Sequence, residues 1–276
     1  NMLIDRSYSF FNPKFGLSLT LSPASMFYGS YSRANREPSR SDYESNINIK
    51  PEQLNDFELG WRFRKNGLRL NINTYYMLYN EQLVLTGELD DVGTPIRTNS
   101  GSSYRMGIET EASMKLSEDF LIKTNLTLSS NKNQQVLSKV DGKIFDFGKT
   151  NISFSPEIIT SNSIVYSPND NLMISFLTKY VGKQFMANTD AVNSVLDSYF
   201  VNNLNLSFNI NSNQVFDQII ITGLVNNIFD KEYVSNGYYY TYDDNWSNPG
   251  QVKTLDGAGY YPQAKRNFLL GLTVKF

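Results

Sequence analysis

The stretch DFELGWRFRKNGLRLNINTYYML, residues 56–78, decides the predicted fold. In its first part every second residue is apolar, and polar residues or glycine fill the positions between; the apolar residues are Phe57, Leu59, Trp61 and Phe63. After a short break at Lys65-Asn66, the alternation resumes from Leu68 to Leu78. Side chains of a β-strand point alternately to the two faces of a sheet. The pattern therefore predicts two strands, each with one apolar and one polar face, joined by a tight turn.

The same period of two recurs along most of the chain and predicts about eleven strands. Their approximate bounds are 10–22, 24–34, 52–64, 67–84, 99–116, 119–132, 148–166, 170–184, 199–212, 214–236 and 262–276. Two regions, near 155–166 and 215–228, carry apolar residues at both parities, so their faces stay unassigned. Several predicted strands reach roughly 14–20 residues, whereas roughly 9–11 suffice to cross a tilted bilayer. We expect their outer ends to project beyond the membrane.

The connections between these strands alternate strictly in length. Short connections are predicted around Pro23, Lys65-Asn66, Ser117-Glu118, Pro168-Asn169 and Ser212-Asn213, and long ones at 35–51, 85–98, 133–147, 185–198 and 237–261. Bacterial outer-membrane barrels have short periplasmic turns and long extracellular loops. A soluble sandwich or lectin is the alternative, but its strands usually have about 5–6 residues. The pattern favours an all-β, transmembrane antiparallel β-barrel.

The composition narrows the possible functions. The chain has no Cys and no His, so it lacks thiolate nucleophiles and the commonest general base, and no catalytic residue is predicted. Its net charge of −2 gives no indication of a nucleic-acid partner. It shows no apolar run of about 18 residues and no signal peptide. The mean hydropathy of −0.38 fits a barrel, in which only alternate residues face lipid.

Four segments resemble the TonB-dependent receptor family of bacterial outer-membrane proteins. They are Lys50-Pro51-Glu52 with Asp56–Gly60, Tyr104–Glu111, Asn226–Tyr233, and Tyr261–Phe268 through Phe276, in the order of the family. The resemblance implies a barrel of 22 strands around a plug domain. About eleven strands match the second half, so residues 1–276 are expected to be the C-terminal part of the barrel. The plug and the first half of the barrel are not visible in this sequence.

The resemblance also implies an orientation. The C-terminus of the barrel lies on the periplasmic side in this family, so strand 262–276 is expected to run toward the periplasm. Counting back through antiparallel strands places residue 1 at the extracellular end. Single-chain bacterial barrels have an even number of strands. We therefore expect the chain to be a fragment, or the ordered part, of a larger receptor.

Charged residues of both signs fall at the positions that face the barrel lumen. The candidates for the lumen and plug contacts are Asp56, Glu58, Arg62, Arg69, Arg105, Glu109 and Glu111, and Lys123 has the same parity on its strand. A hydrated, plugged lumen supplies the water or partners that buried charges require. Glu109 and Glu111 share one face, but an acid–base pair is not favoured, because the chain has no His and no nucleophile context.

The segment 237–261 is predicted to be a long extracellular loop rich in aromatic residues. Its candidate ligand-binding residues are Tyr238, Tyr239, Tyr240, Tyr242 and Trp246. Aromatic rings with polar tips suit a bulky amphipathic ligand. The alternative is an aromatic girdle at the membrane interface together with loop packing. The nearby aspartates match no EF-hand spacing, so neither a metal site nor a cofactor is predicted.

The leading hypothesis from the resemblance is a receptor in the bacterial outer membrane that imports a bulky nutrient, such as a siderophore, by active transport. Its implied partners are the plug domain and the rest of the receptor chain, the TonB energy-transducing complex acting through the plug, and the lipid bilayer. A surface lipoprotein is a further candidate partner. A passive porin, or a structural or adhesin β-protein, is the alternative. The transported substrate stays open.

Overall fold

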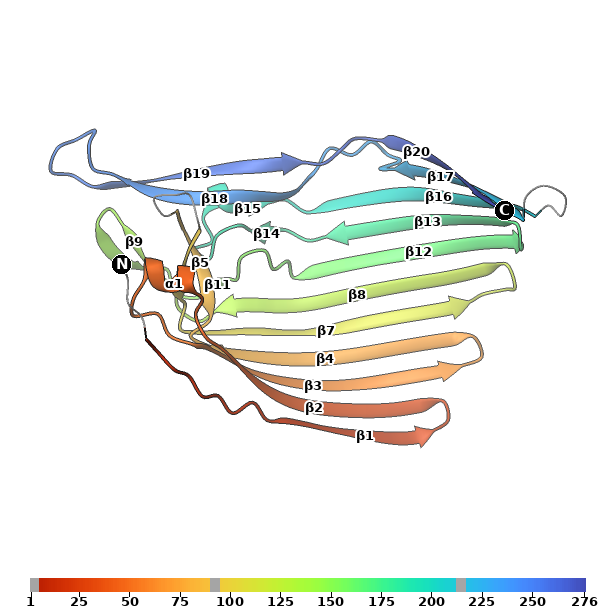
Figure 1. The fold of residues 1–276 in the computed structure, drawn as a ribbon, viewed down its shortest axis with the longest axis horizontal. Coiled ribbons are helices and arrows are strands. Elements are labelled where there is room, and N and C mark those ends of the chain that lie inside the picture. The colour runs from red at the N-terminus through yellow and green to blue at the C-terminus, as the bar shows by residue number, and fades with distance from the viewer. Residues whose placement is uncertain (1–4, 90–94, 212–216) are drawn as a thin grey trace.

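The computed structural model describes residues 5–89, 95–211 and 217–276, which form one large antiparallel sheet (Figure 1). Its strands follow one another in chain order: β1 (Lys14–Ser22), β2 (Ser25–Arg36), β3 (Glu52–Lys65), β4 (Leu68–Asn80), β7 (Ser102–Lys115), β8 (Phe120–Asn133), β12 (Ile158–Asn169), β13 (Leu172–Val181), β16 (Tyr199–Asn211), β17 (Gln218–Asn226) and β20 (Asn267–Lys275). The short β11 (Thr150–Asn151) pairs with the outer end of β8. The predicted fold class and meander are confirmed.

The two ends of the sheet differ as predicted. Tight turns join the strands at one end, and the longer connections gather at the other (Figure 1). These connections contain α1 (Arg40–Ser45), the hairpins β5–β6 (Leu83–Leu89, Pro95–Asn99), β9–β10 (Leu137–Val140, Lys143–Asp146) and β18–β19 (Val234–Asp244, Lys253–Pro262), and the short β14 (Gln184–Phe185), η1 (Val192–Ser194) and β15 (Val195–Leu196). The short connection predicted at Ser212-Asn213 lies outside the described residues.

The turn between β3 and β4 shows how local sequence sets the register. Asn66 and Gly67 both have positive φ, 50° and 78°, and Lys65 pairs with Leu68 across them. A two-residue hairpin turn with positive φ at both positions matches the right-handed twist of the strands, and Asn-Gly adopts it readily. The turn therefore lies one residue later than the predicted Lys65-Asn66.

Several predicted strands are too long. The expected strands 67–84, 148–166 and 214–236 correspond to β4, β12 and β17, which have 13, 12 and 9 residues. Left-handed backbone conformations at Glu81, Phe154 and Asn227 (φ 54°, 51° and 51°) interrupt the extended chain beyond these strands. Beyond these points the chain forms separate hairpins or loops, which an alternating pattern alone does not distinguish from the sheet.

The two faces of the sheet differ in chemistry. Cross-strand register places Leu59 opposite Gly29 and Thr74, and continues through Ile108 to Leu128. Leu59 is 69% exposed, and most strands expose further large apolar side chains on this face. The register also resolves the unassigned region near 155–166, because Ile158 pairs with Leu128 and so joins the apolar face.

The described residues have no single hydrophobic core across the sheet. Two small buried clusters lie toward the long connections, one formed by Tyr43, Ile49 and Leu83, and the other by Val181, Tyr199 and Val201 with Tyr233 against them. Among the described residues, no helix is both long enough and apolar enough to cross a membrane.

Candidate functional site

The seven predicted lumen residues all lie on the polar face of the sheet. They come from β3, β4 and β7, which are hydrogen-bonded neighbours in the sheet. Arg62 pairs with Asn71, and Asn71 pairs with Glu111, so two of them share one cross-strand row. Glu109 lies opposite Asn73 in the next row. Their role as contacts of a plug stays a prediction.

Charge on the polar face is unevenly distributed along the strands. Toward the long connections, Asp56 and Glu58 lie on β3, and one carboxylate oxygen of Asp56 is buried without a hydrogen-bond partner among the described residues. Toward the tight turns, Arg62, Arg64 and Arg69 replace the carboxylates. On β3 and β4 the carboxylates of this face therefore lie toward the long connections and the arginines toward the tight turns, while Arg105 and Glu111 of β7 depart from this division.

Arg105 is the one predicted cation in the acidic part, and its partner comes from a bulge. The chain pairs with β8 at Thr150-Asn151 and again from Ile158. Ile152 and Glu157 still form backbone hydrogen bonds with β8, and residues 153–156 bulge away from it. Arg105 Nη1 donates to Ser155 Oγ at 2.8 Å, and Ser129 Oγ donates to the carbonyl of Pro156 at 3.2 Å. The bulge is thus hydrogen-bonded to both β7 and β8, and through Ser155 it fixes the position of the Arg105 guanidinium.

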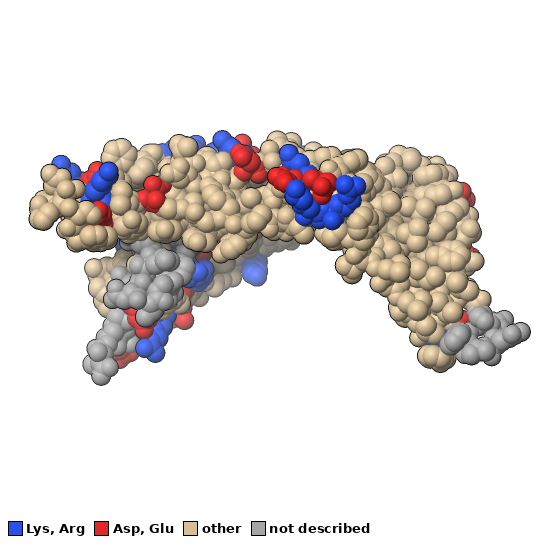
Figure 2. All heavy atoms as spheres, turned by 90° about the horizontal axis from the view of Figure 1, so that it is seen from above, with Lys and Arg blue, Asp and Glu red and all other residues tan. Residues whose placement is uncertain are grey.

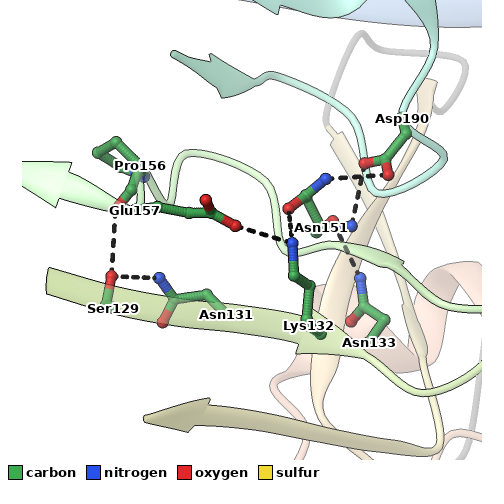
Figure 3. Close-up of polar contacts among 8 residues, drawn as sticks. All are labelled: Ser129, Asn131, Lys132, Asn133, Asn151, Pro156, Glu157 and Asp190. Carbon is green, nitrogen blue, oxygen red and sulfur yellow. Dashed lines mark hydrogen bonds and ion pairs between the residues drawn. The ribbon is translucent and has the colours of Figure 1, made fainter. Parts of the chain in front are cut away.

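A polar network holds this bulge and the outer end of β8 in place (Figure 3). The backbone N–H and side-chain amide of Asn151 both donate to the Asp190 carboxylate at 3.0 Å. Lys132 Nζ donates to Asn151 and, at 2.9 Å, to Glu157. The fully buried Asn133 donates to the carbonyl of Asn151 at 3.3 Å. These contacts join the outer end of β8 to the connection that follows it and to the connection that follows β13.

The segment 237–261 is a long connection at the predicted end of the sheet, but most of it is paired as strands where the sequence predicts a loop. Val234–Asp244 and Lys253–Pro262 pair as the hairpin β18–β19. Alternating side chains in a hairpin divide between two faces. Tyr238, Tyr240 and Tyr242 share one face, whereas Tyr239 points to the other, and the predicted cluster is therefore split. Trp246 follows β18 and continues the first face.

The first face of the hairpin carries a row of rings, exposed except for the half-buried Tyr240, which we call the aromatic row: Tyr261, Tyr238, Tyr240, Tyr242 and Trp246. Successive ring centroids lie 6.0, 6.2, 6.3 and 6.1 Å apart. The rings of Tyr238 and Tyr240 lie over Gly259 and Gly257, where any Cβ would collide with them. Glycine therefore lets these rings lie flat on the sheet while their outer surfaces stay available.

The second face of the hairpin packs against neighbouring connections. Tyr239 donates its hydroxyl to Asp256 Oδ2 at 3.2 Å, and Asn193 donates to the same oxygen at 3.1 Å. Burial, together with the negative charge of Asp256, raises the pKa of Tyr239 to about 12. Tyr239 is thus a neutral, structural tyrosine, and the prediction that it belongs with a surface cluster does not fit this geometry.

The tip of hairpin β9–β10 also docks onto β18–β19. Asp141 and Thr254 exchange hydrogen bonds, with the Asp141 N–H donating to Thr254 Oγ1 at 2.7 Å and the Thr254 N–H donating to Asp141 Oδ1 at 2.8 Å. Thr254 Oγ1 donates to Asp243 at 2.7 Å, and Lys139 forms an ion pair with Asp243 at 3.0 Å. The hydrogen bond from Thr254, followed by that from Lys139, lowers the pKa of Asp243.

A charged cluster marks the point where the hairpin rejoins the sheet. Figure 2 shows basic and acidic side chains gathered between the hairpin and the largely uncharged surface of β17 and β20. Lys265 forms an ion pair with Glu232, and the Arg266 N–H donates to Asp230 at 2.9 Å. Such a boundary between charged and apolar surface is typical of the edge of a bilayer.

Several residues of these sites escaped the sequence patterns. Asn188 and Asp190 lie in an irregular connection, where no periodicity indicates a face, and Asn133 is the last residue of β8. Tyr28 was on an alternating strand, and its ring lies under the Arg62 guanidinium at 4.7 Å. Lys179 lies on β13 in the same row as Glu111, through Asn125 and Ser161, and parity alone could have found it.

Comparison with known proteins identifies the class to which this barrel wall belongs. Residues 3–228 match the family described as TonB dependent receptor-like, beta-barrel. The match covers most of the chain, and the chain belongs to this family. Members of the family are bacterial outer-membrane proteins, which places the chain in that membrane. A search of curated proteins found no match.

Solved structures show the same fold at low sequence identity. The siderophore receptor PiuA from Acinetobacter baumannii superposes with a TM-score of 0.69 at 17% identity, over 94% of this chain and 35% of that one. The ferric-catecholate import receptor Fiu from E. coli K12 gives 0.64 and 17%, over 93% and 34%. The copper transporter OprC gives 0.67 and 17%, over 95% and 39%. The chain therefore spans between a third and two fifths of the length of these proteins.

The described residues contain no cluster of three or more Asp and Glu that could hold a metal ion. The polar face of the sheet carries fixed charges, and the hairpin β18–β19 carries an aromatic surface. Neither arrangement supplies a nucleophile with an adjacent base.

Proposed function

We propose that the chain forms the second half of the wall of an outer-membrane receptor that imports a bulky nutrient by active transport. The observation that carries this is the combination of an apolar outer face with a charged inner face on one continuous meander. In the lumen, Asp56, Glu58 and their neighbours would be hydrated by water or would pair with a plug domain. The TonB complex would supply energy through that plug, and a surface lipoprotein remains a candidate partner.

The aromatic row is the proposed contribution of this half to ligand capture. Rigid amphipathic rings give a large contact area at a low cost in conformational entropy. Structural neighbours include a siderophore receptor and a ferric-catecholate import receptor, and both support a metal chelate as the nutrient. A copper transporter is also among the structural neighbours, so another metal cargo is a further candidate.

Both parts of the proposal, active transport and ligand capture by the aromatic row, can be tested by measuring the uptake of a panel of ferric siderophores in cells that carry the receptor. Uptake should stop when an uncoupler collapses the proton-motive force. Replacing Tyr240, Tyr242 and Trp246 together by Ala should weaken uptake about tenfold, or about 1.4 kcal/mol. Tyr239→Phe is the matched control, because its ring points to the other face, and uptake should be unchanged.

A passive porin is the second candidate, because a wall with charges of both signs can also line a water-filled pore. Uptake that persists after the uncoupler, together with swelling of liposomes that contain the protein, would establish the porin and contradict active transport. Equal uptake by the triple variant and the control would remove the aromatic row from ligand capture.

A further inference from the structure

A hollow of about 570 Å³ lies among the long connections, beyond the outer ends of β4, β7 and β8. Its walls are the base of hairpin β5–β6, the first strand of hairpin β9–β10 and residues 188–189, and we call it the polar hollow. The Ser100 N–H donates to the Gln82 carbonyl at 2.9 Å. The Gln134 N–H donates to the Ser102 carbonyl at the same distance. The pairing of this chain's own segments therefore shapes the hollow, and its volume is in the range of small-molecule sites.

The lining of the polar hollow carries no net charge. Glu81 is its one charged residue among the described residues, and Lys50 Nζ forms an ion pair with the Glu81 carboxylate at 2.7 Å. Val84, Val136 and Leu137 supply apolar surface. Hydroxyl and amide groups, which both donate and accept hydrogen bonds, supply the other polar atoms. They include the side chains of Ser100, Ser102, Gln134, Ser138 and Thr189.

The Ser100 hydroxyl lies in the wall of the polar hollow without a partner. Its Oγ is buried and forms no hydrogen bond with any of the described residues. The preceding residue, Asn99, is satisfied, because its amide donates to the carbonyls of Lys50 and Glu81 and its Oδ1 accepts from the Lys50 N–H. Buried polar groups nearly always have a partner. Asn99 thus fixes this segment, and Ser100 presents a hydroxyl to a partner from outside the chain.

A contact at the far end of hairpin β9–β10 keeps one wall of the hollow in place. The hairpin supplies Ser138 to the lining, and its tip is held on β18–β19 by the two hydrogen bonds between Asp141 and Thr254, at 2.7 and 2.8 Å. A site that is shaped before binding loses less conformational freedom when the ligand arrives. Thr254 therefore positions this wall without lining the hollow.

We propose that the polar hollow binds a neutral, polyhydroxylated molecule of the size of a short oligosaccharide. Sugar hydroxyls donate and accept hydrogen bonds as the lining does, and the C–H face of a sugar ring suits its apolar part. An anion would meet the Glu81 carboxylate without a cation in the lining to oppose it. The inference goes beyond the proposed function, because binding at the outer connections requires neither energy nor passage, and a metal chelate can still be the cargo.

Calorimetry with the full-length receptor, purified in a detergent without a sugar head group, measures the binding of three neutral trisaccharides: maltotriose, cellotriose and chitotriose. At least one should bind saturably. Its affinity should change little between low and high salt, because salt screens interactions between charges and the ligand has none. Trigalacturonate, an anionic trisaccharide, should bind at least tenfold more weakly.

Substitutions in the lining locate the site. The variant Gln134→Leu, Ser138→Ala should lower the affinity at least tenfold, because it removes hydrogen bonds to the ligand. Ser100→Ala should lower it severalfold, and it removes a group with no partner in the folded chain, so folding should be retained. The control Ser247→Ala, Gln251→Leu removes the same kinds of group at exposed positions between β18 and β19 and should leave the affinity unchanged.

Thr254 provides a test of the positioning contact. Thr254→Val should weaken trisaccharide binding, because the wall formed by hairpin β9–β10 loses its anchor. Thr254→Ser keeps the hydroxyl and should bind as the wild type does.

The proposal is overturned if none of the three trisaccharides binds saturably, if trigalacturonate binds more tightly, or if the lining variants bind as well as the control. Calorimetry needs no proton-motive force, so the proposed function is tested separately. Trisaccharide binding without energised uptake of the ferric siderophore panel removes the transport function alone. Energised uptake without trisaccharide binding removes this inference alone.

Discussion

At the scale of the residue, Gly60 shows how an inner wall accommodates a large ring. The Tyr28 ring from β2 lies across Gly60 on β3, donates its hydroxyl to Asn73 Oδ1 at 3.1 Å and lies against Arg62 at 4.7 Å. A Cβ at position 60 would collide with the far end of this ring. One glycine therefore allows a contact that spans three strands.

We expect Gly60→Ala to displace Tyr28 and to lower the free energy of unfolding by roughly 1–3 kcal/mol, the range for overpacked sites. In a Tyr28→Ala background the same substitution should cost much less, because nothing remains to collide with. A double-mutant cycle by denaturant unfolding in detergent measures the coupling. Additive effects of the two substitutions would show that the ring and the glycine do not interact.

The adjacent pair Glu58 and Leu59 tests which face meets lipid. Leu59→Arg places a charge on the apolar face and should cost roughly 2–4 kcal/mol if it lies near the midplane. Glu58→Arg introduces the same side chain on the inner face and should cost much less. Unfolding of both variants in lipid vesicles measures the difference. Equal costs would mean that the two faces are wrongly assigned.

Residue-scale prediction from the sequence succeeded where backbone geometry is regular. In β3 and β7, alternation placed Asp56, Glu58, Glu109 and Glu111 on one face, because parity determines direction in a strand. It could not find Asn133 or Asp190 as partners of the bulge, since their contacts depend on how irregular connections fold back. For the same reason, the sequence alone could not separate Tyr239 from the aromatic row. The faces of this hairpin are known only from the pairing of β18 with β19.

At the scale of the element, the long connections are more structured than a loop prediction implies. The segment 237–261 has aromatic and glycine residues at alternating positions, and this signal could have indicated a hairpin. The sequence analysis instead predicted a long loop there. The predicted strands were too long for a related reason. The alternating pattern continues into the outer hairpins, although the strand has already stopped pairing with its neighbour in the large sheet.

Thr254 joins two of these hairpins, and its hydroxyl is the testable contact. Thr254→Val removes the hydrogen bonds to Asp141 and Asp243, each of about 0.5–1.5 kcal/mol. We expect hairpin β9–β10 to open locally, with faster amide exchange in residues 137–146. Thr254→Ser keeps the hydroxyl and should retain protection. Unchanged exchange in Thr254→Val would show that other contacts hold this junction.

At the scale of the whole molecule, the two faces of one sheet meet two different environments, and the function depends on this difference. Lipid covers the apolar face, while the charged face borders a lumen. The long connections pack on one another through Asp141, Asn193 and Asp256, so this end of the molecule is a joined surface rather than a set of separate loops. Such a surface can hold the aromatic row in a fixed position above the inner wall.

The edges of the sheet give the last prediction. Within the described sheet, β1 and β20 each pair on one side only, and they do not pair with each other. Unpaired backbone groups in lipid cost several kcal/mol each, because no water satisfies them. The isolated 276-residue chain should therefore fail to form a stable monomer in detergent. Heat-modifiable migration, circular dichroism and light scattering measure this. A stable monomer with full β-content would show that β1 and β20 can be satisfied without further strands.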